Sequence, residues 1–165
     1  MTKHQIVIVG GGAAGIATAS SLRSRDASLD IAIIEPSDQH YYQPGWTMVG
    51  AGVFTKGETV RTTDSVWPSG IKRIKGAVAS FAPKNNSVTL EDGSDILYDF
   101  LVVAAGLKLD WGAIEGLEDA LGKNGVTSNY RFDLAPYTWE LVQKMRGKTA
   151  IFTQPPMPIK CAGAP

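Results

Sequence analysis

The segment Gly10-Gly11-Gly12-Ala13-Ala14-Gly15 has residue types and a spacing that suit the binding of phosphate groups. It fits the pattern G-x-G-x-x-G, in which Gly10 allows a tight turn, Gly12 lets the backbone approach a pyrophosphate, and Gly15 permits close packing of a helix on a strand. A helix that begins here would present free N–H groups and the positive end of its dipole to the phosphates. The segment therefore predicts a dinucleotide site.

Glu35 follows Gly15 by twenty residues, at the end of a second apolar run. A carboxylate in that place can accept hydrogen bonds from ribose hydroxyls, and it repels a 2′-phosphate, which disfavours NADP. Taken separately, the glycines are also compatible with an ordinary turn of small residues, and Glu35 with a surface residue at a strand end. Their order and spacing together favour the dinucleotide site.

Cys161 is the single cysteine of the sequence. One cysteine forms no internal disulfide and no cysteine zinc site, and two histidines supply few ligands for a cluster, so we predict no metal site. From the residues, two interpretations stay open: a buried, inert thiol, or a redox thiol whose partner lies elsewhere. The neighbouring Lys160 would favour the thiolate form electrostatically.

The composition is typical of a globular protein without electrostatic bias. The 165 residues include 16 Lys and Arg against 16 Asp and Glu, which argues against a nucleic acid as partner. Residues 5–22 form an uncharged run that resembles a signal peptide. Because Gly10-Gly11-Gly12 interrupts that run, we expect no signal or transit peptide.

The elements that would position these residues begin with a βαβ unit. Residues 6–9 are a β-branched run suited to a buried parallel strand, residues 13–25 have apolar side chains at helical spacing, and residues 31–34 form the next buried strand. The glycine segment then lies between the first strand and the helix, and Glu35 lies at the end of the second strand.

Later segments have a different pattern. Turn-forming residues separate three short runs of strand character, which predicts a small antiparallel β-meander over residues 77–81, 87–90 and 96–98. A buried strand over 100–104, a helix over 136–145 and the beginning of another strand at 149–152 follow. The predicted fold class is α/β: a Rossmann-like domain with a parallel sheet, a glycine-rich βαβ unit and a small antiparallel β-meander.

A meander followed by an apolar strand that ends in Ala-Gly resembles the FAD domain of the two-dinucleotide-binding flavoproteins. Their second signature is an apolar strand ending in Ala-Thr-Gly, and residues 98–106 match it with Ala105 in place of the threonine. The resemblance implies FAD as the cofactor and places Ala105 and Gly106 at its site.

Two further segments, residues 35–52 and 159–165, resemble the sulfide:quinone oxidoreductases, and the likeness covers nearly the whole chain. It implies that Cys161 belongs to a redox cysteine pair and that the FAD contacts include Gly10, Gly12, Ala13, Ala14, Glu35, Gln43 and Val78. Other interpretations stay open: Gln43 as a partner of the loop backbone, Val78 as a core residue, and the aromatic residues Tyr41, Tyr42 and Trp46 as a core cluster.

The residues also argue against two related classes of flavoprotein. Residues 36–60 contain no cysteine, whereas NADPH-dependent disulfide reductases carry two on that segment. Residues 153–158 contain three prolines, which lack N–H donors, where an NADH-binding phosphate loop is needed. We therefore expect a small reductant acting through a cysteine to supply the electrons.

The resemblance implies a reaction in which sulfide attacks a disulfide between Cys161 and a second cysteine, leaving a persulfide. The freed thiolate adds to the flavin, two electrons pass to FAD and then to a quinone, and the sulfur passes to a small acceptor. Two alternatives remain: an NADH:quinone-type flavoprotein oxidoreductase and a non-catalytic flavin-binding module.

We expect residues 1–110 to be the FAD-binding domain, 111–147 a connecting segment with a helix, and 148–165 the start of a second, truncated Rossmann-like domain. The chain would then be the amino-terminal part of a longer enzyme and inactive alone. The whole enzyme would bind a membrane surface through regions absent from this chain, with a bacterial cell membrane favoured over the mitochondrial inner membrane. A sheet face left uncovered would also favour a homo-oligomer.

Overall fold

The computed structural model describes residues 2–154. Its strands are β1 (Thr2–Val9), β2 (Ile31–Ile34), β3 (Gln39–Tyr41), β4 (Val60–Thr62), β5 (Lys72–Ile74), β6 (Val78–Ala82), β7 (Ser87–Leu90) and β8 (Asp95–Val103). Its α-helices are α1 (Ala13–Arg25), α2 (Pro44–Gly50), α3 (Thr63–Val66), α4 (Leu117–Ala120) and α5 (Ala135–Gln143). Short 3-10 helices are η1 (Lys56–Thr59), η2 (Pro83–Asn85) and η3 (Trp111–Ala113).

Six strands form one sheet in the order β5-β2-β1-β8-β7-β6. β1 lies parallel to β2 and to β8, and β2 lies parallel to β5. β7 is antiparallel to both β6 and β8, so the predicted meander is a continuation of the sheet. The predicted α/β fold, with its glycine-rich βαβ unit and its meander, is confirmed.

β8 differs from the prediction of two strands at 96–98 and 100–104. It is one strand, because its register with β1 is the same on both sides of Asp99, from Lys3 opposite Leu97 to Ile6 opposite Phe100. The charge that interrupts the apolar run is exposed, and its carboxylate lies 2.7 Å from the Lys3 ammonium on β1. A solvated ion pair at that point lets the strand continue.

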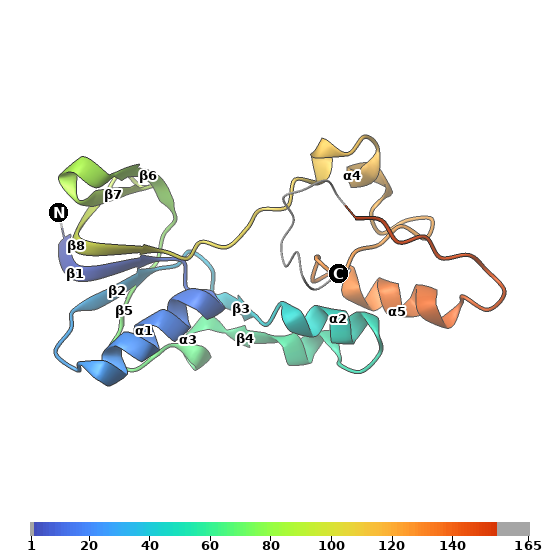
Figure 1. Cartoon of the computed structure of the whole chain (residues 1–165), viewed down its shortest axis with the longest axis horizontal. Coiled ribbons are helices and arrows are strands. Elements are labelled where there is room, and N and C mark those ends of the chain that lie inside the picture. The colour runs from blue at the N-terminus through green and yellow to red at the C-terminus, as the bar shows by residue number, and fades with distance from the viewer. Residues whose placement is uncertain (1, 155–165) are drawn as a thin grey trace.

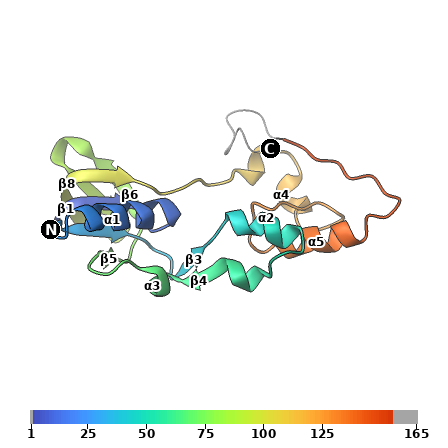
Figure 2. The same ribbon diagram turned by 60° about the horizontal axis from the view of Figure 1, so that its bottom comes forward.

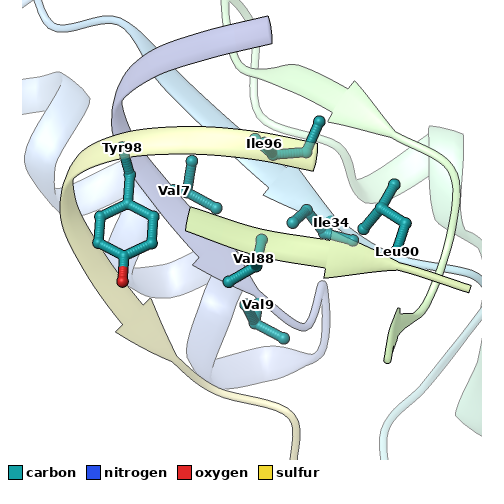
Figure 3. Packing of buried hydrophobic residues seen from close by; sticks show 7 residues of the cluster. All are labelled: Val7, Val9, Ile34, Val88, Leu90, Ile96 and Tyr98. Atoms are coloured by element: carbon teal, nitrogen blue, oxygen red, sulfur yellow. The ribbon is translucent and has the colours of Figure 1, made fainter. Parts of the chain in front are cut away.

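Both faces of β2 and of the second half of β1 are covered, which explains their unbroken apolar runs. The carboxyl-terminal half of β8 was predicted to be buried, but its side chains Phe100 and Val103 are 64% and 60% exposed. α1 covers one face, where Ala19 packs against alternate residues of β1 and β2. The arm formed by β6, β7 and the first part of β8 covers the other face. Figure 3 shows the side chains that meet there from four strands: Val7, Val9, Ile34, Val88, Leu90, Ile96 and Tyr98.

The molecule has two regions (Figures 1 and 2). The sheet region consists of the six-stranded sheet with α1 and α3. The helical region consists of α2, η1, α4 and α5, and its main contact is that of α2 with α5. The antiparallel pair β3 and β4 joins the two regions, as does the segment after β8.

The predicted helix at 136–145 is observed as α5. Residues 149–152, predicted to begin another strand, are not in a strand. No strand in the described part of the chain lies beside them to supply ladder hydrogen bonds, and the side chains of Ile151 and Phe152 are 83% and 93% exposed.

Candidate nucleotide-binding site

The glycine turn between β1 and α1 has no room for side chains at its first and last positions. Gly10 has a φ of +102°, and a Cβ there would lie 2.4 Å from the carbonyl oxygen of Ala104 on the adjacent chain segment. A Cβ at Gly15 would lie 1.9 Å from the carbonyl oxygen of Gly10. These two glycines therefore allow the turn and the close packing of α1, as the motif predicts.

Gly12 is in a different environment. Its backbone is extended, with φ −72°, and a Cβ there would meet no atom within 4 Å. Gly12 is the N-cap of α1, where no side chain caps the helix, and the first turn has no acidic residue. The side chains of Ala13 and Ala14 in that turn are small and exposed. The uncapped N–H groups and the open space suit a pyrophosphate.

Gly11, to which the sequence motif assigns no role, is buried and tightly enclosed. Its N–H donates to Oε2 of Glu35 over 2.7 Å. A Cβ at Gly11 would lie 2.8 Å from Cβ of Glu35 and 3.1 Å from the ring of Trp67. The run of three glycines was the only signal in the sequence that this position is also constrained.

Glu35 lies directly after β2 and connects two loops. Its Oε2 accepts the N–H of Gly11 and its Oε1 accepts the N–H of Ser37, each over 2.7 Å. A carboxylate has about four lone-pair positions, so two hydrogen bonds leave acceptor capacity for ribose hydroxyls. The side chain is half-buried. The geometry thus fits the predicted role and gives Glu35 a second one, holding the glycine turn.

A cavity of about 300 Å³ opens between the carboxyl ends of the strands and the meander. It brings together four of the predicted site residues, Gly10, Glu35, Val78 and Ala105. The rest of its lining is apolar or backbone: Val9, Ile34, Pro36, Gly76, Ala77 and Phe81. An apolar wall with a single carboxylate suits a nucleoside, with the base against the wall and the ribose at the acid. FAD therefore fits the residues present.

The remaining predicted residues lie outside this lining. Gly106 follows β8 with a φ of +76° and open space around it. Gln43 is the N-cap of α2, in the helical region. Cys161 lies outside the described residues. Among the described residues, no group of three His, Cys, Asp or Glu side chains could hold a metal ion.

The aromatic residues after Glu35 have two different environments. Tyr41 and Trp46 pack with Phe132 of the helical region, with ring centroids 4.8 to 6.0 Å apart. They form a partly exposed aromatic cluster, not a buried core, since the side chain of Tyr41 is 40% exposed. The side chain of Tyr42 is 57% exposed and lies outside the cluster. Phe132 was not predicted, because nothing in the sequence links it to Tyr41.

A charged network anchors the loop that follows Glu35. Arg73 on β5 donates to Asp38 over 2.8 Å, to Asp64 over 2.6 Å and to the carbonyl oxygen of Ser37 over 2.9 Å. Lys75 also donates to Asp38. The hydrogen bonds from Lys75 and Arg73 hold the pKa of Asp38 below its ordinary value. The network fixes the loop without occupying the cavity.

Comparison with known proteins places this geometry in a family. Residues 4–142 match the family described as pyridine nucleotide-disulphide oxidoreductase. The mitochondrial sulfide:quinone oxidoreductase of Dictyostelium discoideum is 46% identical over 163 residues, 98% of this chain and 36% of that protein. The chain thus spans about a third of the length of this relative.

A solved structure has the same fold. The sulfide:quinone oxidoreductase of Aquifex aeolicus superposes with a TM-score of 0.68 at 28% identity, covering 88% of this chain and 32% of that one.

A relative named for a different activity matches a smaller part of the chain. A type II NADH:quinone oxidoreductase of Mycobacterium tuberculosis is 31% identical over 109 residues, 63% of this chain and 23% of that protein.

The predicted cofactor and the predicted resemblance are both confirmed by these relationships, since the family consists of FAD-binding flavoproteins. The chain belongs to the pyridine nucleotide-disulphide oxidoreductase family, and relatives that match nearly its whole length are sulfide:quinone oxidoreductases.

Proposed function

We propose that this chain supplies the pyrophosphate- and ribose-binding part of an FAD-dependent enzyme that oxidises sulfide and reduces a quinone. The observation that carries the proposal is the extent of the relationship. The match to a sulfide:quinone oxidoreductase covers 98% of the chain at 46% identity, whereas the match to an NADH:quinone oxidoreductase covers 63% at 31%. Residues 1–110 would form the FAD-binding domain, 111–147 a connecting segment and 148–165 the start of a second Rossmann-like domain.

The residues of the glycine turn have separate roles in this proposal. Gly12, Ala13 and Ala14 offer the N–H groups of the first turn of α1 to the pyrophosphate. Gly10 and Gly15 shape the turn, and Glu35 accepts hydrogen bonds from the ribose. Further contacts with FAD would come from Gln43, Val78, Ala105 and Gly106, with Val78 contributing its backbone.

Cys161 would carry the sulfur chemistry together with a second cysteine of the full-length protein. Sulfide attacks their disulfide, so that one S–S bond forms, giving a persulfide, and one breaks, releasing a thiolate. Transfer of the outer sulfur to a small acceptor leaves two thiols, and re-forming their disulfide releases two electrons and two protons. FAD, when bound, accepts this electron pair and passes it to the quinone.

The site of quinone reduction implies a membrane surface. No helix in the described part of the chain has both the length and the apolar character needed to span a bilayer. We propose peripheral attachment through regions outside this chain, to a bacterial cell membrane, and association of copies into a homo-oligomer.

An anaerobic absorbance spectrum of the full-length protein tests the function. Sulfide should bleach the oxidised flavin, added quinone should restore it, and NADH should have no effect. Bleaching by NADH and not by sulfide would favour an NADH:quinone oxidoreductase, which the partial match to that enzyme makes the second candidate. Bleaching by neither would leave a non-catalytic flavin-binding module.

Cys161→Ser tests the cysteine directly. A redox role predicts a stable, yellow, FAD-loaded protein whose flavin sulfide no longer reduces, because neither the disulfide nor the persulfide forms. A merely structural thiol predicts turnover close to that of the wild type.

A further inference from the structure

His40 on β3 contacts the glycine turn, although it follows Gly11 by 29 residues in the sequence. Its Nδ1 lies 3.3 Å from the carbonyl oxygen of Gly11. A carbonyl oxygen only accepts hydrogen bonds, so Nδ1 must carry the hydrogen and donate it. The imidazole is half-buried, and its position on β3 follows from the pairing of His40 with Arg61 on β4.

This contact orients the peptide that joins Gly11 to Gly12. In a planar trans peptide the C=O and the following N–H point in opposite directions. Holding the carbonyl of Gly11 on the side of His40 therefore turns the N–H of Gly12 away from His40. No protein atom would lie within 4 Å of a Cβ at Gly12, so this is the open part of the turn.

The preceding peptide is held as well, because the N–H of Gly11 donates to Glu35. Glycine backbones have many accessible conformations, and fixing one costs entropy. The side chains of Glu35 and His40, both from the segment after β2, thus hold the two peptides that flank Gly11. Preorganisation of this kind strengthens binding by lowering that cost.

His40 also borders a second hollow, of about 310 Å³, with the charged residues Glu58 and Arg61 among its lining. Both have partners of their own. Glu58 accepts hydrogen bonds from Thr55 at the start of η1, and Arg61 donates to the carbonyl oxygens of Glu58 and Val60. The hydrogen bond of the His40 imidazole is the one with the carbonyl oxygen of Gly11.

We propose that His40 is a positioning residue for the FAD pyrophosphate: by donating to Gly11 it presents the N–H of Gly12 to the phosphates. The inference rests on the proposed binding of FAD at the glycine turn. It gives a role to a residue that the glycine motif does not include.

The test compares His40→Leu with His40→Asn in the full-length apoprotein. Leucine removes the donor, and the loss of one hydrogen bond should weaken FAD binding about three- to tenfold. The side-chain amide of asparagine can donate from nearly the position of Nδ1, so His40→Asn should restore most of the affinity. The affinity for ADP, measured by competition with FAD, should fall by the same factor as the affinity for FAD, because ADP has the pyrophosphate but not the flavin.

His4→Leu is the matched control. His4, the other histidine, contacts Asp30 at the opposite end of β1 and should leave FAD affinity unchanged. Any of three results would overturn the role of His40. His40→Leu could bind FAD as tightly as the wild type, or His40→Asn could fail to restore the affinity. The third result is a lower affinity for FAD with an unchanged affinity for ADP. Failure of the proposed site has a different signature: Gly12→Val would then retain FAD, whatever the result at His40.

Discussion

The two regions of the molecule use glycine in different ways. In the sheet region, Gly10 and Gly15 are surrounded by backbone atoms, whereas Gly12 between them faces open space. In the helical region, Gly50 and Gly52 make room for the side chains of Asn129 and Trp139. Glycine is therefore required by packing at some positions and leaves space for a ligand at another. The space around each one distinguishes them, and each can be tested by adding a side chain.

Gly15→Ala should have the largest effect. The new Cβ would lie 1.9 Å from a backbone oxygen, which cannot move aside without displacing the turn. We expect a loss of more than about 3 kcal/mol of stability, together with the loss of FAD. Thermal unfolding of the full-length protein measures the loss of stability, with Gly12→Ala as the control. Equal midpoints for the two variants would mean that α1 does not need this close approach.

Glu35→Ala should weaken FAD binding by about 1.5 to 3 kcal/mol, since it removes charge-assisted hydrogen bonds to ribose and releases the N–H of Gly11. Titration of the apoprotein with FAD gives the dissociation constant. Glu140→Ala, on α5 in the helical region, is the control and should bind FAD normally. An unchanged constant for Glu35→Ala would reduce Glu35 to a surface residue.

Gly52→Ala should destabilise the helical region and leave the FAD site intact. Gly52 has a φ of +74°, and a Cβ would lie 2.4 Å from the ring of Trp139. We expect a loss of about 1 to 3 kcal/mol in thermal unfolding, with wild-type FAD affinity. Gly57→Ala, where the added Cβ meets nothing, should unfold as the wild type does. A lower FAD affinity of the Gly52→Ala protein would show that the sheet region and the helical region are coupled.

Asp38→Asn should have the smallest effect, and one that depends on pH. Because Lys75 and Arg73 lower the pKa of Asp38, its contribution to stability is present above the ordinary value of 3.8 and is lost as pH falls through the lower folded value. The difference in unfolding midpoint between wild type and variant should be small at pH 7 and vanish in acid. A difference that grows on acidification would contradict the ion pairs.

Much of the sheet region could be predicted from the sequence, because its signals are local, but β5 and α3 were not predicted and β8 was predicted as two strands. The bounds of α1, β2 and β7 follow from periodicity and turn residues, and the glycine motif with Glu35 predicts the candidate site. The helical region could not, apart from α5. Its helices are short, and the packing of Phe132 on Tyr41 joins residues about ninety positions apart with no pattern to link them. Residues 149–152 were wrongly predicted as a strand, because an apolar run specifies a strand only where a partner strand is present.

Within the site itself, the residues missed were those that act on the backbone. Gly11 occupies an unassigned position of the motif. The imidazole of His40 on β3 hydrogen-bonds to its carbonyl oxygen, a contact that the fold creates. A side chain that bonds to a distant peptide leaves no signature in residue spacing. Glu35 was predicted as a ligand for ribose, but its hydrogen bond to Gly11 depends on the same three-dimensional arrangement.

The FAD content of Gly12→Val tests the central claim most directly. Gly12 and Gly57 both have open space around them, so neither Gly12→Val nor Gly57→Val should prevent folding. We predict that the purified full-length Gly12→Val protein has the thermal stability of the wild-type apoprotein but contains no FAD, because the valine side chain fills the space of the pyrophosphate. Gly57→Val should remain yellow. Normal flavin content in a folded Gly12→Val protein would contradict the site.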